Sequence, residues 1–238
     1  MPAHRSDPTS SVIELNEVVF GWPGASTPTL EIAHLQVAKG EHLFIKGPSG
    51  CGKSTLLSLL TGINLATQGS VALLGSDMRT LSASQRDRFR ADHIGYIFQQ
   101  FNLLPYLSVL DNVTLPCHFS PLRKQQVSGS LLQKAQSLLE RLHLPTALLN
   151  KPVTELSIGQ QQRVAAARAL IGEPNLIIAD EPTSALDFDN REAFIALLRE
   201  EAERVGSTLV FVSHDPTLEK LFERSIHLPT LNRAGGWQ

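Results

Sequence analysis

The sequence predicts an α/β fold: a core of buried parallel strands that alternate with helices, interrupted by an inserted helical lobe. Residues 176–179 and 208–213 are apolar runs of strand length without the alternation of a half-exposed strand, so we expect them to be central parallel strands. A third run at residues 42–46 leads into a glycine-rich loop and a helical stretch. Strands and helices that alternate in this way are typical of an α/β core.

The remaining elements follow from local patterns. Residues 54–61 predict a helix that Gly62 stops, and residues 94–98 predict another strand. The sequence pattern changes between residues 99 and 155. Here a set of apolar side chains recurs at helical spacing: Leu131, Leu132, Ala135, Leu138, Leu139 and Leu142. We therefore expect a single domain over residues 1–238, with a core of residues 11–98 and 156–230 and a helical subdomain at about 99–155.

The composition narrows the class of protein. A chain of 238 residues can bury a large core, and a formal net charge of -2 offers no basic footprint for nucleic acid. The two cysteines, Cys51 and Cys117, cannot form the disulfide framework of a secreted protein. Residues 1–11 lack the apolar core of a signal peptide, and no run of about 18 apolar residues could span a bilayer. We expect no nucleic-acid partner, and a membrane role only through another protein.

The strongest single motif lies at residues 47–54. Their sequence, GPSGCGKS, matches the phosphate-loop pattern G-x-x-x-x-G-K-[ST] in full. Glycines let backbone N–H groups close around a phosphate where a Cβ would intrude. Lys53 places a positive charge on the phosphates, and the Ser54 hydroxyl suits a magnesium ion. We expect the loop to bind nucleotide through Gly47, Pro48, Ser49, Gly50, Cys51, Gly52, Lys53, Ser54 and Thr55.

An acidic pair and a histidine follow two of the predicted strands. Asp180 is suited to hold Mg²⁺ through water, and Glu181 to polarise an attacking water molecule. An acidic helix start is the alternative, since Pro182 follows directly. His214 comes after the strand at 208–213, where we expect it to reach the γ-phosphate region and stabilise the transition state. Together with the phosphate loop, these residues predict an ATPase that uses Mg²⁺.

The chain has a second edge suited to an anion. Residues 156–160, LSIGQ, begin a helix after a Ser and a Gly, which leaves free backbone N–H groups at the positive end of the helix dipole. The phosphate loop and this helix start are two candidate phosphate-binding sites on one small domain. We infer that one of them binds a nucleotide held by another copy of the chain. We therefore expect a homodimer that forms around ATP.

With these motifs in this order, the chain resembles the nucleotide-binding subunits of ATP-binding cassette (ABC) transporters over nearly its whole length. Residues 47–54 resemble the Walker A motif, 156–160 the signature motif, 176–180 the Walker B motif and 184–187 the D-loop. The resemblance implies a P-loop NTPase core with additional antiparallel strands and an inserted helical subdomain. It also implies that Glu181 is the catalytic glutamate, His214 the switch histidine, and Gln99 the Q-loop glutamine, which acts in catalysis and on the metal.

The same resemblance implies nucleotide contacts outside the phosphate loop. Trp22, in a segment that resembles the aromatic A-loop, would stack on adenine, with Phe20 as the nearby rival. Four further residues would bind the nucleotide: Ser157, Gly159, Gln160 and Asp187. Ser157 and the backbone of Gly159 are expected to touch the γ-phosphate held by the opposite subunit. The family signature usually reads Leu-Ser-Gly-Gly-Gln, and Ile158 departs from it. We expect Ile158 to be accommodated if its side chain points away from the nucleotide.

The branch within the family is a finer inference. Residues 90–105 and 111–116 resemble the macrolide-efflux and lipoprotein-releasing ATPases, which implies a separate integral membrane permease and a peripheral position on the cytoplasmic face of the inner membrane. Polar amino-acid import ATPases share residues 98–103 and 182–187 and are the alternative, as is a non-translocating ATPase that regulates a periplasmic process. A chromosome-maintenance ATPase would insert a long coiled coil after Gln99, and the chain has room only for a short lobe.

An apolar segment follows Gln99. If Phe101, Leu103, Leu104, Tyr106 and Leu107 were exposed together, they would mark a surface that a partner covers. The alternative is that they pack the core of the helical lobe. We expect a groove here that accepts a short cytoplasmic helix of the permease.

Overall fold

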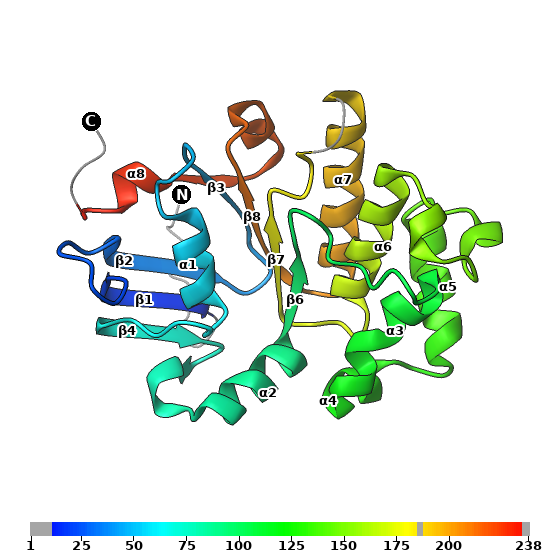
Figure 1. Ribbon diagram of the computed structural model, residues 1–238, viewed down its shortest axis with the longest axis horizontal. Helices are drawn as coiled ribbons and strands as arrows, with labels where there is room; N and C mark the ends of the chain where they lie inside the picture. The colour runs from blue at the N-terminus through cyan, green and yellow to red at the C-terminus, as the bar shows by residue number, and fades with distance from the viewer. Residues whose placement is uncertain (1–10, 185–187, 235–238) are drawn as a thin grey trace, which may run out of the picture.

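A five-stranded parallel sheet forms the centre of the molecule, with strand order β6-β7-β8-β3-β9. The computed structural model describes residues 11–184 and 188–234. Figure 1 shows the sheet between an antiparallel sheet on one side and a group of helices on the other. The strands are β3 (His42–Lys46), β6 (Ile94–Ile97), β7 (Leu176–Asp180), β8 (Thr208–Ser213) and β9 (Arg224–His227). The predicted α/β class and the buried strands are confirmed.

The second sheet is antiparallel and has the strand order β2-β1-β4-β5. Its strands are β1 (Ser11–Phe20), β2 (Leu30–Ala38), β4 (Gln68–Leu73) and β5 (Ser76–Asp77). In β1, Ile13 and Leu15 are fully buried while Glu14 and Asn16 are partly exposed, which is the alternation of a sheet with one face on the core. This sheet lies beside α1 (Lys53–Leu60), the helix that follows the phosphate loop (Figure 1).

The two faces of the parallel sheet belong to two different hydrophobic clusters. Phe44 of β3 packs in one cluster with the helices, whereas its neighbours Leu43 and Ile45 pack in the other with α1 and the antiparallel sheet. Successive side chains of a strand point to opposite faces, so a strand buried on both sides must be apolar throughout. This requirement explains why residues 42–46 and 208–213 were recognisable as central strands.

Most of the helices cover the face of the parallel sheet away from the antiparallel one (Figure 1). Residues 99–155 contain α3 (Val109–Phe119), α4 (Pro121–Gln126) and α5 (Leu131–Arg141), so the helical spacing at 131–142 predicted a helix correctly. The other helices are α2 (Ala83–His93), α6 (Ile158–Leu170), α7 (Phe188–Arg204) and α8 (Leu228–Leu231). Short 3₁₀ turns are η2 (Met78–Thr80), η3 (Thr146–Leu148), η4 (Val153–Glu155) and η5 (Pro216–Leu221).

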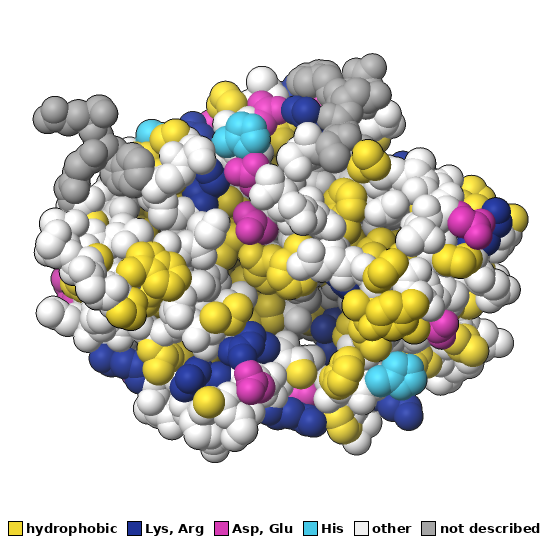
Figure 2. Space-filling model, viewed as in Figure 1, with side chains coloured by type: hydrophobic (Ala, Val, Ile, Leu, Met, Phe, Trp, Pro, Cys, Tyr) yellow, Lys and Arg dark blue, Asp and Glu magenta, His cyan; other side chains and the backbone are white. Residues whose placement is uncertain are grey.

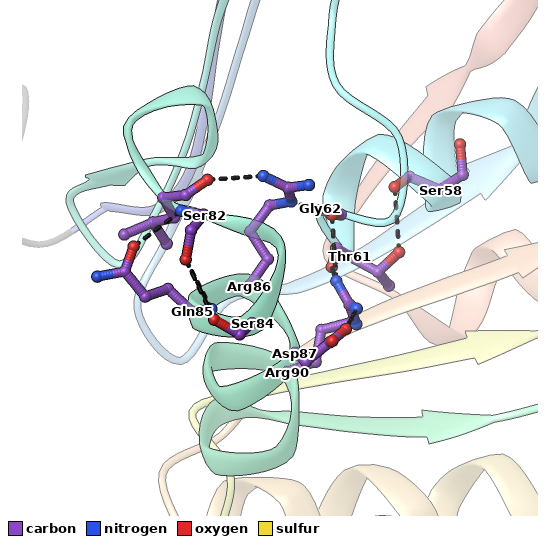
Figure 3. Close-up of polar contacts among 10 residues, drawn as sticks. Ser58, Thr61, Gly62, Ser82, Ser84, Gln85, Arg86, Asp87 and Arg90 are labelled. Atoms are coloured by element: carbon purple, nitrogen blue, oxygen red, sulfur yellow. Dashed lines mark hydrogen bonds and ion pairs between the residues drawn. The ribbon is translucent and has the colours of Figure 1, made fainter.

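Helix α2 supports the carboxyl end of α1. Arg90 of α2 donates hydrogen bonds to the carbonyl oxygens of Thr61 and Gly62, and Arg86 donates to the same Gly62 oxygen at 3.1 Å (Figure 3). The last carbonyl groups of a helix lack partners within it, and the negative end of its dipole favours cations. The two arginines therefore stabilise the carboxyl end of α1. The amino end of the same helix follows directly on the phosphate loop.

Candidate functional site

The phosphate loop joins the end of β3 to the start of α1. Gly50 and Gly52 have φ of +84° and +97°, a region that side chains with a Cβ rarely adopt. A Cβ on Gly47 would lie 2.5 Å from the Sγ of Cys51, so this position also requires glycine. Gly52 caps α1 without a side-chain hydrogen bond. The first N–H groups of α1 are therefore available to an anion.

Lys53 points back into the loop. Its ammonium group donates hydrogen bonds to the carbonyl oxygens of Gly47, at 2.8 Å, and Pro48, at 3.0 Å. The same nitrogen lies 3.5 Å from Oε1 of Glu181. Lys53 is only 9% exposed, so a phosphate that it contacts is bound by a partly desolvated charge. The lysine thus connects the phosphate loop with the acidic pair at the end of β7.

Asp180 closes β7, and Tyr96 of the neighbouring strand β6 donates its hydroxyl proton to Oδ2 of Asp180 at 3.3 Å. Burial raises the pKa of the Asp180 carboxyl, and the nearby charge of Glu181 raises it further, while Tyr96 and Lys53 act in the opposite direction. Burial and the Asp180 charge together raise the pKa of the Tyr96 phenol, which stays a donor. A partly buried carboxylate of this kind is stabilised by a cation beside it.

Glu181 follows in a strained conformation. Its φ is +45°, in the left-handed region that disfavours residues with a side chain, and its N–H donates to the carbonyl oxygen of Val212 at 2.9 Å. Oε2 of Glu181 lies 2.7 Å from Nδ1 of His214. The backbone geometry at the end of β7 therefore turns this carboxylate between His214 and Lys53.

One open cleft of about 620 Å³ is lined by Lys53, by the acidic pair at residues 180–181 and by His214. Figure 2 shows acidic, basic and histidine side chains close together on this face of the molecule. The structure brings together the predicted catalytic and metal-binding residues, and much of the phosphate loop, in this cleft. The lining residues are Pro48, Ser49, Gly50, Gly52, Lys53, Ser54, Thr55, Gln99, Asp180, Glu181 and His214. Gly47 and Cys51 belong to the same loop but are buried behind it, and burial raises the pKa of the Cys51 thiol.

The signature residues lie in a different hollow of about 310 Å³, lined in part by Ser157, Gly159 and Gln160. Ser157 begins α6 with a capping box: its hydroxyl accepts from the N–H of Gln160, whose side-chain oxygen accepts from the N–H of Ser157. The proton of the Ser157 hydroxyl remains available to a ligand oxygen. Ile158 is 53% exposed, on the surface rather than in the core. Asp187 lies outside the described residues.

Trp22 and Phe20 differ in exposure. Phe20 is 6% exposed and packs in the core, whereas Trp22 is 48% exposed and meets Phe20 edge to face, with ring centroids 5.2 Å apart. Only Trp22 offers an open ring face, which favours it over Phe20 as the residue that stacks on a base. Neither residue lines the cleft of the phosphate loop.

Three side chains that contact the site or the backbone next to it were not singled out from the sequence. Besides Tyr96, Arg168 of α6 donates to the carbonyl oxygens of Phe101 and Asn102, just after Gln99. Gln162 of α6 donates to the carbonyl oxygen of Pro182, just after Glu181, at 2.8 Å. The position of Tyr96 within a predicted strand beside the Walker B strand was a usable signal. The two α6 contacts join segments distant in sequence, which no local pattern reports.

The apolar segment after Gln99 does not expose all five of its large side chains. Phe101 is 6% exposed and part of the core cluster, and Leu103 packs against that cluster. Tyr106, in contrast, is 78% exposed. A separate apolar groove of about 460 Å³ lies nearby, between α2, β6 and α3, and its lining includes Tyr96, Phe98 and Phe119. For Phe101 the alternative therefore holds, because its ring completes the core.

The cleft fits a nucleotide with a divalent cation. A glycine loop that excludes Cβ atoms, an uncapped helix start and Lys53 match the phosphates. The Ser54 hydroxyl and the Asp180 carboxylate offer the oxygen ligands that Mg²⁺ prefers. Among the residues that the structure describes, no group of three or more His, Cys, Asp and Glu could hold a metal by themselves. This donor set suits a cation that is held partly by substrate phosphates and water.

The fold and this site define an ATP-binding cassette with a Walker-type hydrolytic centre. The chain belongs to the ABC transporter family, whose sequence model, described as "ABC transporter", matches residues 30–184. It is therefore an ATP-binding protein and an ATPase.

Several relatives are similar over most of the chain. The lipoprotein-releasing system ATP-binding protein LolD of Shewanella denitrificans is 39% identical over 222 residues, which cover 92% of this chain and 93% of that protein. The macrolide export ATP-binding/permease protein MacB of Shigella flexneri is 38% identical over 91% of this chain but only 33% of its own length. The predicted branch is thus confirmed.

The fold is similar to that of solved cassettes. The ABC transporter cassette MJ0796, solved as a dimer, superposes with a TM-score of 0.78 and 36% identity, over 90% of this chain and 93% of that one. The dimeric post-hydrolysis state of MJ0796 bound to ADP and Pi also gives a TM-score of 0.78, with 35% identity. A protein of that name from Methanocaldococcus jannaschii is 40% identical over 200 residues.

Proposed function

We propose that the chain is the ATPase subunit of a transporter and works as a homodimer that closes around ATP to drive a separate membrane permease. The permease would be of the lipoprotein-releasing or macrolide-export kind, as in the relatives LolD and MacB. The subunit would sit at the cytoplasmic face of the membrane through that partner. None of the described helices is both long and apolar enough to cross a bilayer.

One observation carries the dimer proposal. Lys53, Glu181 and His214 line one cleft, whereas Ser157 and Gly159 line another. Both sets are typical of phosphate contacts, and a single nucleotide cannot occupy the two hollows of one chain at once. Two copies placed head to tail would bring the signature hollow of each over the phosphate cleft of the other. The MJ0796 cassettes, which are dimers, support this arrangement.

Within the cleft we assign roles by geometry. Lys53 binds the β- and γ-phosphates, and Glu181 orients and polarises the attacking water as a general base. His214 holds Glu181 in place through their hydrogen bond and faces the γ-phosphate region. Ser54, Asp180 and Gln99 would contact Mg²⁺, which neutralises charge on the phosphates.

Mixing two inactive variants tests the shared site. Lys53→Ala removes the phosphate charge, and Gly159→Glu places a carboxylate where the signature helix would meet the γ-phosphate of the other copy. An acidic residue in the first turn of α6 suits the helix dipole, so Gly159→Glu should fold. Each variant alone should be nearly inactive. A mixed dimer has one intact composite site, so mixing should restore hydrolysis.

The doubly substituted chain, Lys53→Ala with Gly159→Glu, is the matched control. Mixed with either single variant, it provides no intact composite site and should restore nothing. If the two single variants also fail to restore activity, although light scattering shows that they form mixed dimers, each site is built within one chain and the proposal is wrong.

Two alternative functions require the same ATPase but a different membrane partner. An amino-acid importer would pair with a permease and a solute-binding protein, whereas a regulator of a periplasmic process would move no substrate. The 38–39% identity to the export and release ATPases favours the first assignment. Co-purification of the chain with its permease, followed by reconstitution, distinguishes these partners directly.

A further inference from the structure

The segment at residues 228–234 is tied to the strand that follows the Trp22 loop. Asn232 is 6% exposed, and its side-chain oxygen accepts from the N–H of Glu31 at 2.8 Å, while its amide nitrogen donates to the carbonyl oxygen of Thr29 at 3.0 Å. The N–H of Arg233 donates to the carbonyl oxygen of Glu31 at 2.7 Å. Residues 29–31 are therefore fixed by three hydrogen bonds from this segment.

Residues 29–31 in turn close the loop that carries Trp22. The N–H of Thr29 donates to the carbonyl oxygen of Phe20 at 2.8 Å, and this bond joins the two ends of the loop at residues 21–28. Trp22 lies two residues beyond that bond and packs edge to face on Phe20. The position of Thr29 is therefore one of the constraints on the loop that carries the indole ring, beside the pairing of Phe20 with Leu30.

The same segment also contacts the phosphate loop. A Cβ built on Gly47 would lie 3.2 Å from Cδ of Pro229 and 3.6 Å from Cβ of Leu228, which is fully buried. On the other side, a Cβ on Gly52 would lie 2.9 Å from Cδ2 of Leu30. Figure 1 shows α8 beside β3 and above β2. The segment is thus packed between residues 29–31, which follow the loop of Trp22, and the phosphate loop.

We propose that Asn232 is a positioning residue that holds the Trp22 loop at the correct distance from the phosphate loop, so that adenine and phosphates are bound together. The inference rests on the proposed adenine contact of Trp22. Residue 232 lies outside the matched family region at residues 30–184, so nothing in the family motifs assigns it this role. The buried amide is well suited to it, because its donor and acceptor are both engaged with the backbone of one strand start.

The test compares ligands with and without a base. Dissociation constants for ATP and for inorganic tripolyphosphate are measured by calorimetry on the full chain carrying Asn232→Ala. We expect the affinity for ATP to fall about tenfold, a loss typical of base stacking on an aromatic ring, and the affinity for tripolyphosphate to be unchanged. Asn232→Asp keeps an acceptor for Glu31 but turns a carboxylate oxygen towards the carbonyl oxygen of Thr29, so a loss at least as large in the same direction is expected.

Two control variants separate positioning from stability. Thr230→Ala changes an exposed side chain of the same segment, whose partner is His227, and should leave both affinities unchanged. Asn112→Ala removes a fully buried amide in α3 and should lower the melting temperature without changing the ratio of the two affinities. If Asn232→Ala weakens both ligands equally, or neither, the proposal is wrong.

A double variant tests whether Asn232 affects ATP binding through the indole ring of Trp22. If Asn232 acts through Trp22, Asn232→Ala should weaken ATP binding little further in a Trp22→Ala background, and a full additional loss would contradict the proposal. Trp22→Ala alone tests the underlying adenine contact. Normal ATP binding by that variant would refute the contact itself. A loss with Trp22→Ala but none with Asn232→Ala would refute only the role of Asn232.

Discussion

Nδ1 of His214 lies 2.7 Å from Oε2 of Glu181, while Oε1 of the same carboxylate lies 3.5 Å from the ammonium group of Lys53. The two oxygens of Glu181 therefore face two different partners, one after β8 and one in the phosphate loop. The strained φ of +45° at Glu181 is what directs the side chain between them. A water molecule placed against this carboxylate would be polarised by a base whose position is fixed on both sides.

We predict that Glu181→Gln abolishes most hydrolysis and retains ATP binding. The amide has nearly the same shape but cannot accept a proton from the attacking water, so the rate should fall by about 10²- to 10⁴-fold. The variant should accumulate as an ATP-bound dimer, which size-exclusion chromatography with light scattering detects. Glu140→Gln, the same change at an exposed position on α5, is the control. Wild-type turnover by Glu181→Gln would refute the role of this glutamate.

Trp22→Ala should weaken nucleotide binding about tenfold through loss of stacking. ATP and GTP should be affected alike, since a ring face reads little of the edge of a base. Phe20→Ala should instead lower the melting temperature, because Phe20 is 6% exposed in the core. Calorimetric titration and thermal unfolding of both variants check this. Normal ATP binding by Trp22→Ala, together with a specific loss in Phe20→Ala, would reverse the assignment.

Sequence patterns predicted the parallel core well because its strands are buried on both faces. Residues 42–46 and 208–213 became β3 and β8 with the predicted bounds. The helix start at residues 156–160 was predicted from a Ser and a Gly, and the structure shows that Ser157 caps α6 through a capping box with Gln160, which is a local device. The antiparallel sheet was expected only from the family resemblance, since its strands were not recognised from their own pattern.

The site was predictable as a set of residues but not as a geometry. The phosphate-loop pattern encodes a backbone conformation, so it could be read directly at Gly50 and Gly52. The left-handed φ of Glu181 and its contact with His214 depend on strands that lie far apart in the sequence. Which of the five apolar residues after Gln99 is buried could not be predicted either, because the core that takes up the Phe101 ring is formed by several helices.

Asp180→Asn should increase the stability of the nucleotide-free protein and abolish its ATPase activity. Burial raises the folded-state pKa of this carboxyl above its unfolded value of 3.8, so above about pH 4 its ionisation favours the unfolded state. Asp180→Asn removes that charge and still accepts the proton of Tyr96. We expect the nucleotide-free variant to unfold at higher urea concentration at pH 7, with the difference shrinking as the pH falls towards 4. Magnesium-dependent hydrolysis should be lost. A less stable variant at pH 7 would contradict this account.

Arg168 should support the backbone after Gln99. Phe101 and Asn102 have φ of +59° and +48°, and the guanidinium of Arg168 donates to both of their carbonyl oxygens. Lysine cannot present two parallel donors, so Arg168→Lys should cost about 1–2 kcal/mol of unfolding free energy. Hydrolysis should fall as well, since Gln99 is only two residues before Phe101. Urea unfolding and ATPase rates check both effects, and an unchanged rate with lowered stability would limit Arg168 to a structural role.

The apolar groove should dock the permease. Phe98 and Phe119 line it and are 40% and 66% exposed, and Tyr106 is 78% exposed in the segment after the Q-loop. Figure 2 shows hydrophobic side chains around the hollow in this region. Exposed aromatic rings beside a groove of about 460 Å³ are typical of a surface that accepts a short amphipathic helix.

Cysteines introduced at Phe119 or Tyr106 should therefore crosslink to a cytoplasmic loop of the permease in membranes. Lys39→Cys, on the exposed turn between β2 and β3, should not. Cys51 and Cys117 are buried, so they should contribute little background. The groove shares Tyr96 with the contact to Asp180, so a helix seated there would touch the side chain that donates to the carboxylate proposed to bind Mg²⁺. On that account the isolated chain should hydrolyse ATP slowly and the permease should accelerate it. Fast hydrolysis by the chain alone, without crosslinks, would show that the motor does not depend on this surface.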